Sequence, residues 1–215
     1  MKKYEFTGEV KRIKLIGTEV VLRRIRAVTA FGVVEAGDIG GWIEKEENLS
    51  HDGSAWVHSS AWVYGDARVR GDARVYGDAR VRGDAWVYGN ARVYGDAEVC
   101  GDAWVYGDAR VHGNARVYGD ARVCGNAEVC GDAEVYSANH IFSIGPVGSR
   151  DGHTTFYRCK NKKIEVRCGC FNGRIEEFIE KVAETHGKNK HASVYRAAAE
   201  IAKLQIFGVT TWDIK

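Results

Sequence analysis

A pattern of apolar and polar positions repeats every six residues through residues 54–136. Alanine recurs at every sixth position from Ala55 to Ala133, and a valine follows two residues after each alanine, from Val57 to Val135, in fourteen units without an insertion. Residues two apart in an extended strand point to the same face, so the alanines and valines share a buried face. The Gly-Asp or Gly-Asn pair between most units is a turn signal, because glycine and asparagine tolerate a positive φ. A period this strict predicts a solenoid of short strands and corners.

Three such units would form one coil with three flat sides and eighteen residues. Each valine precedes the next alanine by four positions, and this spacing resembles the hexapeptide repeat of left-handed parallel β-helices, where an aliphatic residue precedes a small one. Fourteen units would give between four and five coils, stacked about 4.8 Å apart at the spacing of neighbouring strands. We therefore expect a left-handed parallel β-helix of hexapeptide repeats in the middle of the chain.

Outward positions eighteen residues apart are expected to stack on one side of this β-helix. One side combines aromatic residues with framing arginines. Arg68, Trp86, Trp104 and Arg122 form one column, and Arg70, Tyr88, Tyr106 and Cys124 form the column beside it. Exposed aromatic patches are typical of protein contact surfaces, so we predict that the two tryptophans and two tyrosines form an interface with a partner protein or a second copy. The alternative is that these ladders only stabilise neighbouring strands.

The pattern also divides the chain into segments. Residues 1–36 predict an N-terminal β segment, 37–136 the β-helix with 37–53 as its capping entry, and 137–215 a C-terminal α+β module. Ile43 and Leu49 lie twelve and six residues before Ala55, so we expect the register of six to begin within the capping entry. The ends of a solenoid need an atypical cap to cover the open core.

The C-terminal segment predicts strands at 141–144, 154–159 and 164–168, followed by two amphipathic helices. Asn172 is the expected cap of the first helix and Gly187 its end. The predicted buried faces of the helices are Ile175, Phe178, Ile179 and Val182 in the first, and Val194, Ala197, Ala198, Ile201 and Leu204 in the second. The overall fold class is therefore mainly β with a small α+β C-terminal module.

Charge is unevenly distributed along the chain. The net charge of +2 divides into zero for residues 1–53, −3 for 54–136 and +5 for 137–215. The basic C-terminal segment favours an anionic partner. Acid at nearly every corner of the repeat argues against nucleic acid as that partner. No apolar run is long enough to span a membrane, and no signal peptide is expected at Met1-Lys2-Lys3.

A candidate ligand site lies in the C-terminal segment. The sequence Gly145-Pro146-Val147-Gly148-Ser149-Arg150 combines two glycines, a hydroxyl and a guanidinium. Exposed backbone N–H groups beside an arginine suit a phosphate or carboxylate. The alternative is that the glycines only form a turn. The predicted ligand-binding residues are Gly145, Gly148, Ser149, Arg150, His153, Thr154, Thr155 and Arg158.

Catalysis and metal binding are less favoured. Acyltransferases with hexapeptide β-helices use a histidine base and a loop that protrudes from a coil, whereas this repeat has no insertion, and His58 and His112 lie three coils apart. Cys168-Gly169-Cys170 lacks the Cys-x2-Cys spacing of a zinc knuckle, with Cys159 predicted on the neighbouring strand, so free structural thiols are expected. We assign no catalytic residue, cofactor or metal, and the sequence leans against an enzyme.

Three blocks resemble a family of hexapeptide-repeat proteins encoded by bacteriophages and prophages, described loosely as polymer-forming cytoskeletal-like. They are the entry Gly37-Asp38-Ile39-Gly40-Gly41-Trp42-Ile43-Glu44 with Asn48-Leu49-Ser50, the Gly-Asp-Ala-Arg-Val-Tyr array, and a tail formed by residues 145–150, Thr154-Thr155-Phe156-Tyr157 and Cys168-Gly169-Cys170-Phe171. The resemblance implies a phage setting and the cytoplasm of a host bacterium, but no catalytic residues.

These observations lead to one functional expectation and several alternatives. We expect a non-enzymatic phage protein with a rigid β-helix scaffold, a homo-oligomer (trimer or dimer), whose C-terminal module binds an anionic small molecule or nucleotide and so sequesters a host immune signal. The first alternative is anti-defence binding of a host defence protein through the aromatic side. A structural virion component and a divergent hexapeptide acyltransferase are the others.

Overall fold

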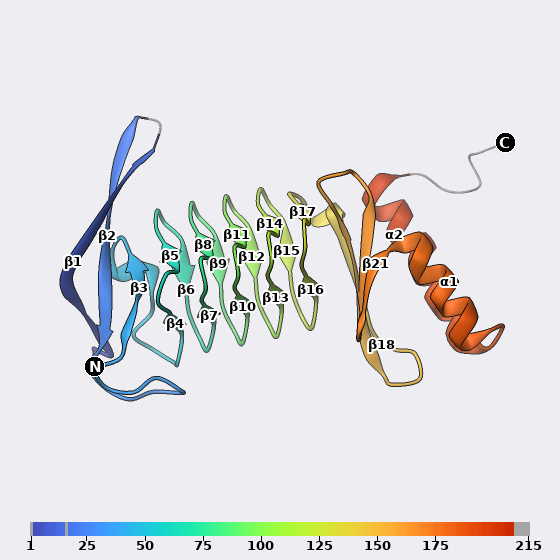
Figure 1. Ribbon diagram of the computed structural model, residues 1–215, viewed down its shortest axis with the longest axis horizontal. Coiled ribbons are helices and arrows are strands. Elements are labelled where there is room, and N and C mark those ends of the chain that lie inside the picture. The colour runs from blue at the N-terminus through green and yellow to red at the C-terminus, as the bar shows by residue number, and fades with distance from the viewer. Residues whose placement is uncertain (1, 16, 209–215) are drawn as a thin grey trace.

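A computed structural model describes residues 2–15 and 17–208. The molecule is a row of stacked coils, with a β-hairpin at one end and an α+β module at the other (Figure 1). This arrangement confirms the predicted class, a parallel β-solenoid of six-residue units with a small C-terminal α+β module. No helix in the described part of the chain is long and apolar enough to cross a membrane.

The solenoid contains fourteen two-residue strands. They are β4 (Trp56–Val57), β5 (Trp62–Val63), β6 (Arg68–Val69), β7 (Arg74–Val75), β8 (Arg80–Val81), β9 (Trp86–Val87), β10 (Arg92–Val93), β11 (Glu98–Val99), β12 (Trp104–Val105), β13 (Arg110–Val111), β14 (Arg116–Val117), β15 (Arg122–Val123), β16 (Glu128–Val129) and β17 (Glu134–Val135). Each pairs in parallel with the strand three units away, which produces three sheets in the orders β5-β8-β11-β14-β17, β16-β13-β10-β7-β4 and β15-β12-β9-β6. Three N-terminal strands extend the first of these to eight strands. We call these the eight-stranded, five-stranded and four-stranded sides.

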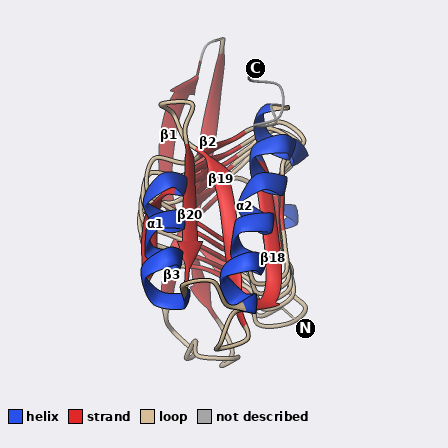
Figure 2. Ribbon diagram, turned by 90° about the vertical axis from the view of Figure 1, so that its right-hand side faces the viewer, coloured by secondary structure: helices blue, strands red, loops and turns tan. Residues whose placement is uncertain are grey.

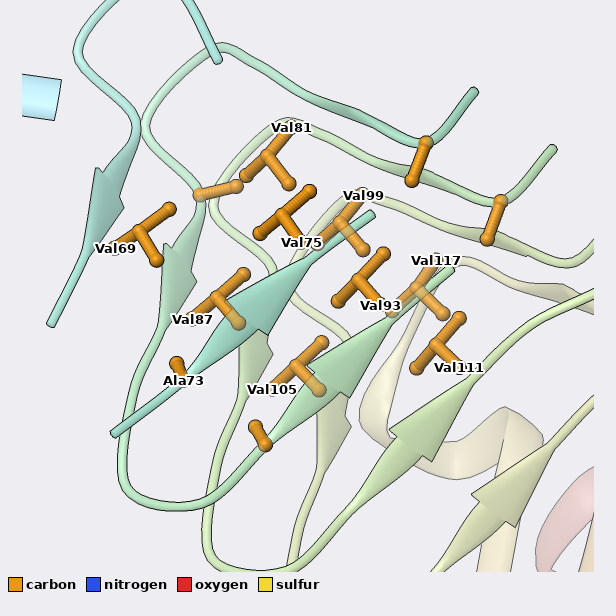
Figure 3. Close-up of a cluster of buried hydrophobic side chains, with 14 of the residues drawn as sticks. Val69, Ala73, Val75, Val81, Val87, Val93, Val99, Val105, Val111 and Val117 are labelled. Carbon is orange, nitrogen blue, oxygen red and sulfur yellow. The ribbon is translucent and has the colours of Figure 1, made fainter. Parts of the chain in front are cut away.

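Valine and alanine fill the interior as the period predicts. Every alanine and valine of the units lies in one continuous core and is almost fully buried. Figure 3 shows valines of successive coils stacked in rows, with Val75 beside Val93 and Val87 beside Val105. Backbone N–H groups of one coil donate to carbonyls of the next, as Arg92 N does to Ala109 O at 2.9 Å. The coils therefore stack through both core and backbone.

The N-terminal segment extends the eight-stranded side and covers the first coil. Strands β1 (Tyr4–Leu15) and β2 (Thr18–Ala27) form an antiparallel hairpin, and β3 (Ile39–Ile43) joins β2 to β5, followed by a short 3-10 helix (Glu46–Asn48). Tyr4 and Phe31 pack edge-on against Trp56 at ring-centroid distances of 6.3 and 5.4 Å, and the Lys3 ammonium donates to Ala55 O. The cap thus uses residues from the first 36 positions as well as from 37–53.

The expected register of the capping entry is wrong by two residues. Ile43 pairs with Val63 and Leu49 bridges Val69, so both occupy valine positions, twenty residues before their partners instead of eighteen. The two additional residues fall in the turn before Ala55, where Gly53 adopts a positive φ.

The C-terminal module consists of an antiparallel sheet covered by two helices. After a short 3-10 helix (Ala138–His140) come β18 (Ile141–Val147), β19 (Gly152–Arg158), β20 (Ile164–Cys168), β21 (Phe171–Arg174), α1 (Ile175–His186) and α2 (Lys190–Phe207). Figure 2 shows both helices side by side across one face of this sheet. Gly145–Val147 belong to β18 and not to a loop, while Asn172 lies in β21 and Arg174 precedes the helix instead.

The predicted buried face of α2 is wrong except at Ala198, which is buried as expected. Val194, Ile201 and Leu204 are exposed, whereas small residues and one tyrosine face the sheet. The buried residues of α2 are Ala192, Tyr195, Ala198, Ala199, Ala202 and Ile206. Alanines let the helix lie close to the sheet, so closeness of approach decides the buried face more than side-chain hydrophobicity.

Strand β19 crosses the last coil and joins the module to the solenoid. Tyr157 is fully buried and its hydroxyl lies 3.2 Å from Cys130 Sγ, while Cys159 bridges Ala133. Nearby, Glu128 N donates to Thr155 Oγ1 at 3.1 Å. The sheet therefore caps the C-terminal end of the core with one face and carries the helices on the other.

The Glu128 carboxylate adds charge pairing to this joint. Its Oε1 lies 3.0 Å from His112 Nε2 and 3.2 Å from Arg167 Nε of the module. The hydrogen bond with His112, together with Arg167, lowers the pKa of Glu128 despite its partial burial. The charged carboxylate thus favours the docked state.

Close stacking predicts a graded cost for adding a methyl group at the corners. A Cβ on Gly95 would lie 3.0 Å from the backbone nitrogen of Gly113 in the next coil, whereas one on Gly125 would meet nothing within 4 Å. Both glycines have positive φ, so alanine at either position must adopt a strained left-handed backbone. In Gly125→Ala this strain alone should lower the free energy of unfolding, by roughly 1–2 kcal/mol. Gly95→Ala should lose about 1 kcal/mol more from overpacking. Equal losses in equilibrium urea unfolding would show that stacking is looser than described.

The joint predicts a pH-dependent stability. Because the folded pKa of Glu128 is depressed, its contribution is present above the unfolded pKa of about 4.3 and is lost as pH falls through the folded pKa. Glu128→Gln should lower the free energy of unfolding by about 1–2 kcal/mol at neutral pH, and this difference should disappear in strong acid. Glu134→Gln, which removes a carboxylate without an ion pair in the described chain, is the matched control. Urea unfolding of the parent and both variants across the pH range measures these differences. A difference between Glu128→Gln and the parent that does not change with pH would contradict the prediction.

Candidate functional site

A cleft of about 500 Å³ opens in the C-terminal module between the β18–β19 turn, the β20–β21 turn and the helices. Its apolar lining includes Val147, Phe171, Phe178 and Val182. Its polar and charged lining is Ser149, Arg150, His153, Cys168, Cys170, Lys181, Thr185, His186 and Tyr195. No aspartate or glutamate is among the described residues that line it. The cleft therefore combines an apolar surface with cationic and hydrogen-bonding groups.

The β18–β19 turn forms one wall through a close contact with α2. Gly148 has a φ of 81°, and a Cβ there would lie 1.9 Å from the Tyr195 hydroxyl oxygen, so glycine is required for this approach. Ser149 and Arg150 follow at the exposed tip of the turn, on the rim of the cleft. The glycine thus places the guanidinium predicted from the sequence beside the cleft.

Helix α1 contributes the opposite wall with one face. Phe178, Lys181, Val182 and Thr185 follow at i, i+3, i+4 and i+7, so they line the cleft together. Lys181 Nζ also lies 2.9 Å from Glu184 Oε2, but both side chains are largely exposed and such a pair is weak. The sequence interpretation missed Lys181, Thr185 and His186, although the i, i+3, i+4 spacing that joins them to Phe178 was a usable signal.

Two of the lining groups, the Cys168 thiol and the Tyr195 hydroxyl, lie close to each other, and the thiol contacts the buried Thr154 hydroxyl. Thr154 is fully buried and its Oγ1 donates to Cys168 Sγ at 3.1 Å, while the Tyr195 hydroxyl lies 3.8 Å from the same sulfur. Burial, and then the neighbouring Cys168 thiol, raises the pKa of Tyr195 to about 12. The tyrosine is therefore protonated at neutral pH and can donate a hydrogen bond.

The structure separates the other predicted ligand-binding residues. Thr155 faces the solenoid and accepts from Glu128 N, on the opposite side of the sheet from Thr154. Arg158 ends β19, and its guanidinium lies 4.7 Å from the Tyr136 ring centroid, whereas Arg150 precedes the start of that strand. The two arginines therefore do not converge on one ligand.

His153 and Gly145 lie at the edge of the cleft. The His153 ring packs against the Gly145 backbone, where a Cβ would lie 2.5 Å from its Cδ2. His153 Nε2 lies 3.2 Å from Asn126 Nδ2 at a corner of the solenoid. His153 therefore lines the cleft and also connects the module to the last coil.

The six cysteines are free thiols, and those of the module do not form one cluster. Cys159 packs in the solenoid core, whereas Cys168 faces the helices with Thr154. Burial and the nearby Glu165 carboxylate raise the pKa of Cys159, which keeps it as a thiol. Throughout residues 2–15 and 17–208, no group of three or more metal-ligating side chains is placed to hold a metal ion.

The predicted aromatic ladder is a second candidate surface, on the four-stranded side. Trp86 stacks on Trp104 at 5.9 Å and Tyr88 on Tyr106 at 5.0 Å between ring centroids, which confirms the expected stacking. Arg68 and Arg70 lie over Trp86 and Arg122 over Trp104, with guanidinium-to-centroid distances of 5.1, 5.1 and 5.4 Å. Trp104 is 37% exposed. We call these four rings the aromatic side.

Comparison with known proteins concerns the repeat and not the cleft. A family model for the YdcK β-solenoid repeat matches residues 73–89, 85–101, 109–125 and 115–131. The protein named "Uncharacterized acetyltransferase YdcK" of Escherichia coli (strain K12) is 37% identical over 62 residues, which covers 27% of this chain and 19% of the relative. The chain thus matches less than a fifth of that relative. Its repeat array is similar to the β-solenoid repeats of the YdcK family.

Proposed function

We propose that the cleft of the C-terminal module binds an anionic small molecule with an apolar or aromatic part, of the nucleotide class. The observation that carries this proposal is the lining of the cleft, which combines Arg150 and Lys181 with apolar side chains and contains no carboxylate among the described residues. The solenoid acts as the rigid support that holds the module.

The cationic groups favour an anion for a simple electrostatic reason. Arg150 on the turn and Lys181 on α1 approach the cleft from opposite walls, and His186 also lines it. A phosphate between two such cations gains charge-assisted hydrogen bonds from both, and Glu184, the exposed partner of Lys181, competes only weakly. Ser149 and the protonated Tyr195 supply neutral donors.

The apolar surface favours a ligand that is more than an inorganic anion. Phe171 and Phe178 lie 5.5 Å apart between ring centroids at the cleft, with Val182 beside them. A planar base can bury its faces against such side chains while its phosphate reaches the cations. A nucleotide has a part for each: its base suits the apolar side chains and its phosphate suits the cationic groups.

The proposed role of the cleft is to hold the nucleotide without altering it. The sequence resemblance implies a phage setting, and a protein that holds a host signalling nucleotide without altering it would suppress that signal. The site supports this because its lining residues are explained by binding alone. Unchanged nucleotide recovered after prolonged incubation is the expected result, and a hydrolysed product would contradict sequestration.

The proposal predicts a specific loss of affinity in Arg150→Ala. Calorimetric titration should show adenosine monophosphate binding at least roughly tenfold more tightly than adenosine, and this advantage should disappear in Arg150→Ala. The melting temperature should not change, because Arg150 is exposed. Lys188→Ala, which removes an exposed cation of the same module outside the cleft, should bind as the parent does. Equal affinity for the two probes, or full binding by Arg150→Ala, would overturn the proposal.

A second candidate function is protein binding through the aromatic side. Its support is the exposed Trp104 within stacked rings that are framed by arginines. Aromatic and arginine residues are enriched where proteins bind one another, so a host defence protein or a second copy of this chain would fit this surface.

Trp104→Ala separates this candidate from a purely stabilising ladder. The variant should lose a partner that co-purifies from bacterial cells, or lose self-association in analytical ultracentrifugation, because it removes the most exposed ring of the surface. Tyr118→Ala removes a stacked ring from the eight-stranded side and should keep the partner. Loss of thermal stability in Trp104→Ala without any change in association would support the stabilising role instead.

A further inference from the structure

The five-stranded side of the solenoid places arginine directly opposite arginine. Arg74 pairs in register with Arg92, and Arg92 with Arg110, on neighbouring parallel strands. Like charges that face each other across strands about 4.8 Å apart repel, so this arrangement is unfavourable in the absence of a counter-charge.

The other two sides avoid this repulsion. On the eight-stranded side the register alternates in sign, through Arg80, Glu98, Arg116 and Glu134. On the four-stranded side each arginine faces a tryptophan, as Arg68 does Trp86 and Arg122 does Trp104. The same repeat can therefore place a neutral or acidic residue at this position, and the arginine ladder needs its own explanation.

Among the described residues, only one of the three arginines, Arg110, has a carboxylate opposite it in register. Arg110 faces Glu128 in the next strand. Within the described ranges, neither Arg74 nor Arg92 forms an ion pair. Asp72, the acid at the preceding corner, accepts hydrogen bonds from Ser54, which lower its pKa most, and Arg74 adds only a smaller effect. The uncompensated charge is thus concentrated at the N-terminal end of this side.

A cavity of about 460 Å³ lies at that end. Its lining residues are His58, Ser59, Arg74, Tyr76, Gly77 and Arg92. The described lining contains two guanidinium groups, an imidazole and two hydroxyls, and no carboxylate. The His58 ring packs edge-on against Tyr76 at 6.1 Å between centroids. Asp38 is the one acid of the described chain that acts on the pKa of His58, and it does not line the cavity. The described lining therefore offers several hydrogen-bond donors and no carboxylate to pair with the two guanidinium groups.

The corner at this cavity departs from the repeat. Ser59-Ser60 stands where every later corner up to Gly131-Asp132 has Gly-Asp or Gly-Asn. Ser59 has a φ of 39°, a conformation that glycine would adopt with less strain. Ser60 stands where the next coil has Asp78. The Ser59-Ser60 pair thus supplies hydroxyls instead of a carboxylate at the corner beside Arg74 and Arg92.

We propose that His58, Ser59, Arg74 and Arg92 form a binding site for a phosphate or sulfate group. The two arginines would donate to the anion from neighbouring strands, and the His58 imidazole and Ser59 hydroxyl would donate from the corner. The bound anion neutralises the repulsion between Arg74 and Arg92. This site lies on the solenoid and is independent of the cleft in the C-terminal module.

Titration with inorganic phosphate at constant ionic strength, followed by ¹H–¹⁵N spectra, tests the site. Saturable shifts are expected at the Ser59 amide and at the Arg74 and Arg92 side-chain Nε signals. The double variant Ser59→Gly, Ser60→Asp restores the regular corner, so it should keep or raise the melting temperature. It should also weaken phosphate binding at least roughly tenfold. Arg92→Gln should weaken binding to a similar degree.

Arg110→Gln is the matched control, because it removes an arginine of the same ladder outside the cavity and opposite Glu128. It should change the affinity less than about twofold. Glycerol 3-phosphate in place of inorganic phosphate distinguishes the source: tighter binding of the ester indicates a phosphoryl group on a larger molecule, and weaker binding a free anion. Absence of saturable shifts at Ser59, full binding by the double variant, or equal losses in Arg110→Gln and Arg92→Gln would overturn the proposal. Shifts confined to Arg150 and Lys181 would also overturn it, while leaving the cleft proposal intact.

Discussion

No coil of this solenoid can bury its alanines and valines alone, because the flat faces of its core must be covered by the coils before and after it. The six-residue period keeps the strands in register, so backbone hydrogen bonds and core rows continue from β4 to β17. This nearest-neighbour stacking leaves two open ends, which must be covered for the core to exclude water. The N-terminal hairpin and the C-terminal sheet meet that requirement, and the whole architecture follows from it.

The same constraint decides where chemistry can occur. Inward positions are fixed as alanine or valine, and corners favour glycine, with Ser59 as an exception, so variation is concentrated at outward positions and in the caps. The repeat uses this freedom differently on its three sides, with alternating charge, aromatic rings and unpaired arginines. The C-terminal cap uses one face of its sheet for the core and the other for two helices, and the cleft lies where that second face meets them.

Sequence reasoning succeeded where the signal is local and repeated. The position of every alanine and valine, and the stacking of Trp86 on Trp104, follow from the period alone. It failed where tertiary packing decides. Val194 and Leu204 mark the more hydrophobic face of α2, yet the sheet receives Ala198, Ala199 and Ala202 because they allow closer approach.

The candidate site was only partly predictable for the same reason. Arg150 and Ser149 belong to a glycine-rich segment that is visible in the sequence, whereas Lys181 reaches the cleft only because α1 packs across the sheet. Thr154 and Thr155 are adjacent in sequence but lie on opposite faces of β19, so only Thr154 shares the face that carries the helices, and neither lines the cleft. The alternation of a strand could have indicated this division once the strand was assigned.

Native mass spectrometry of the protein purified from bacterial cells, with denaturation to release any bound molecule, tests the central claim most directly. We predict a stoichiometric anionic ligand with a nucleotide-like mass, released intact on unfolding. A preparation with no bound molecule that also fails to take up added nucleotides would contradict the claim that the C-terminal cap is a nucleotide-binding module.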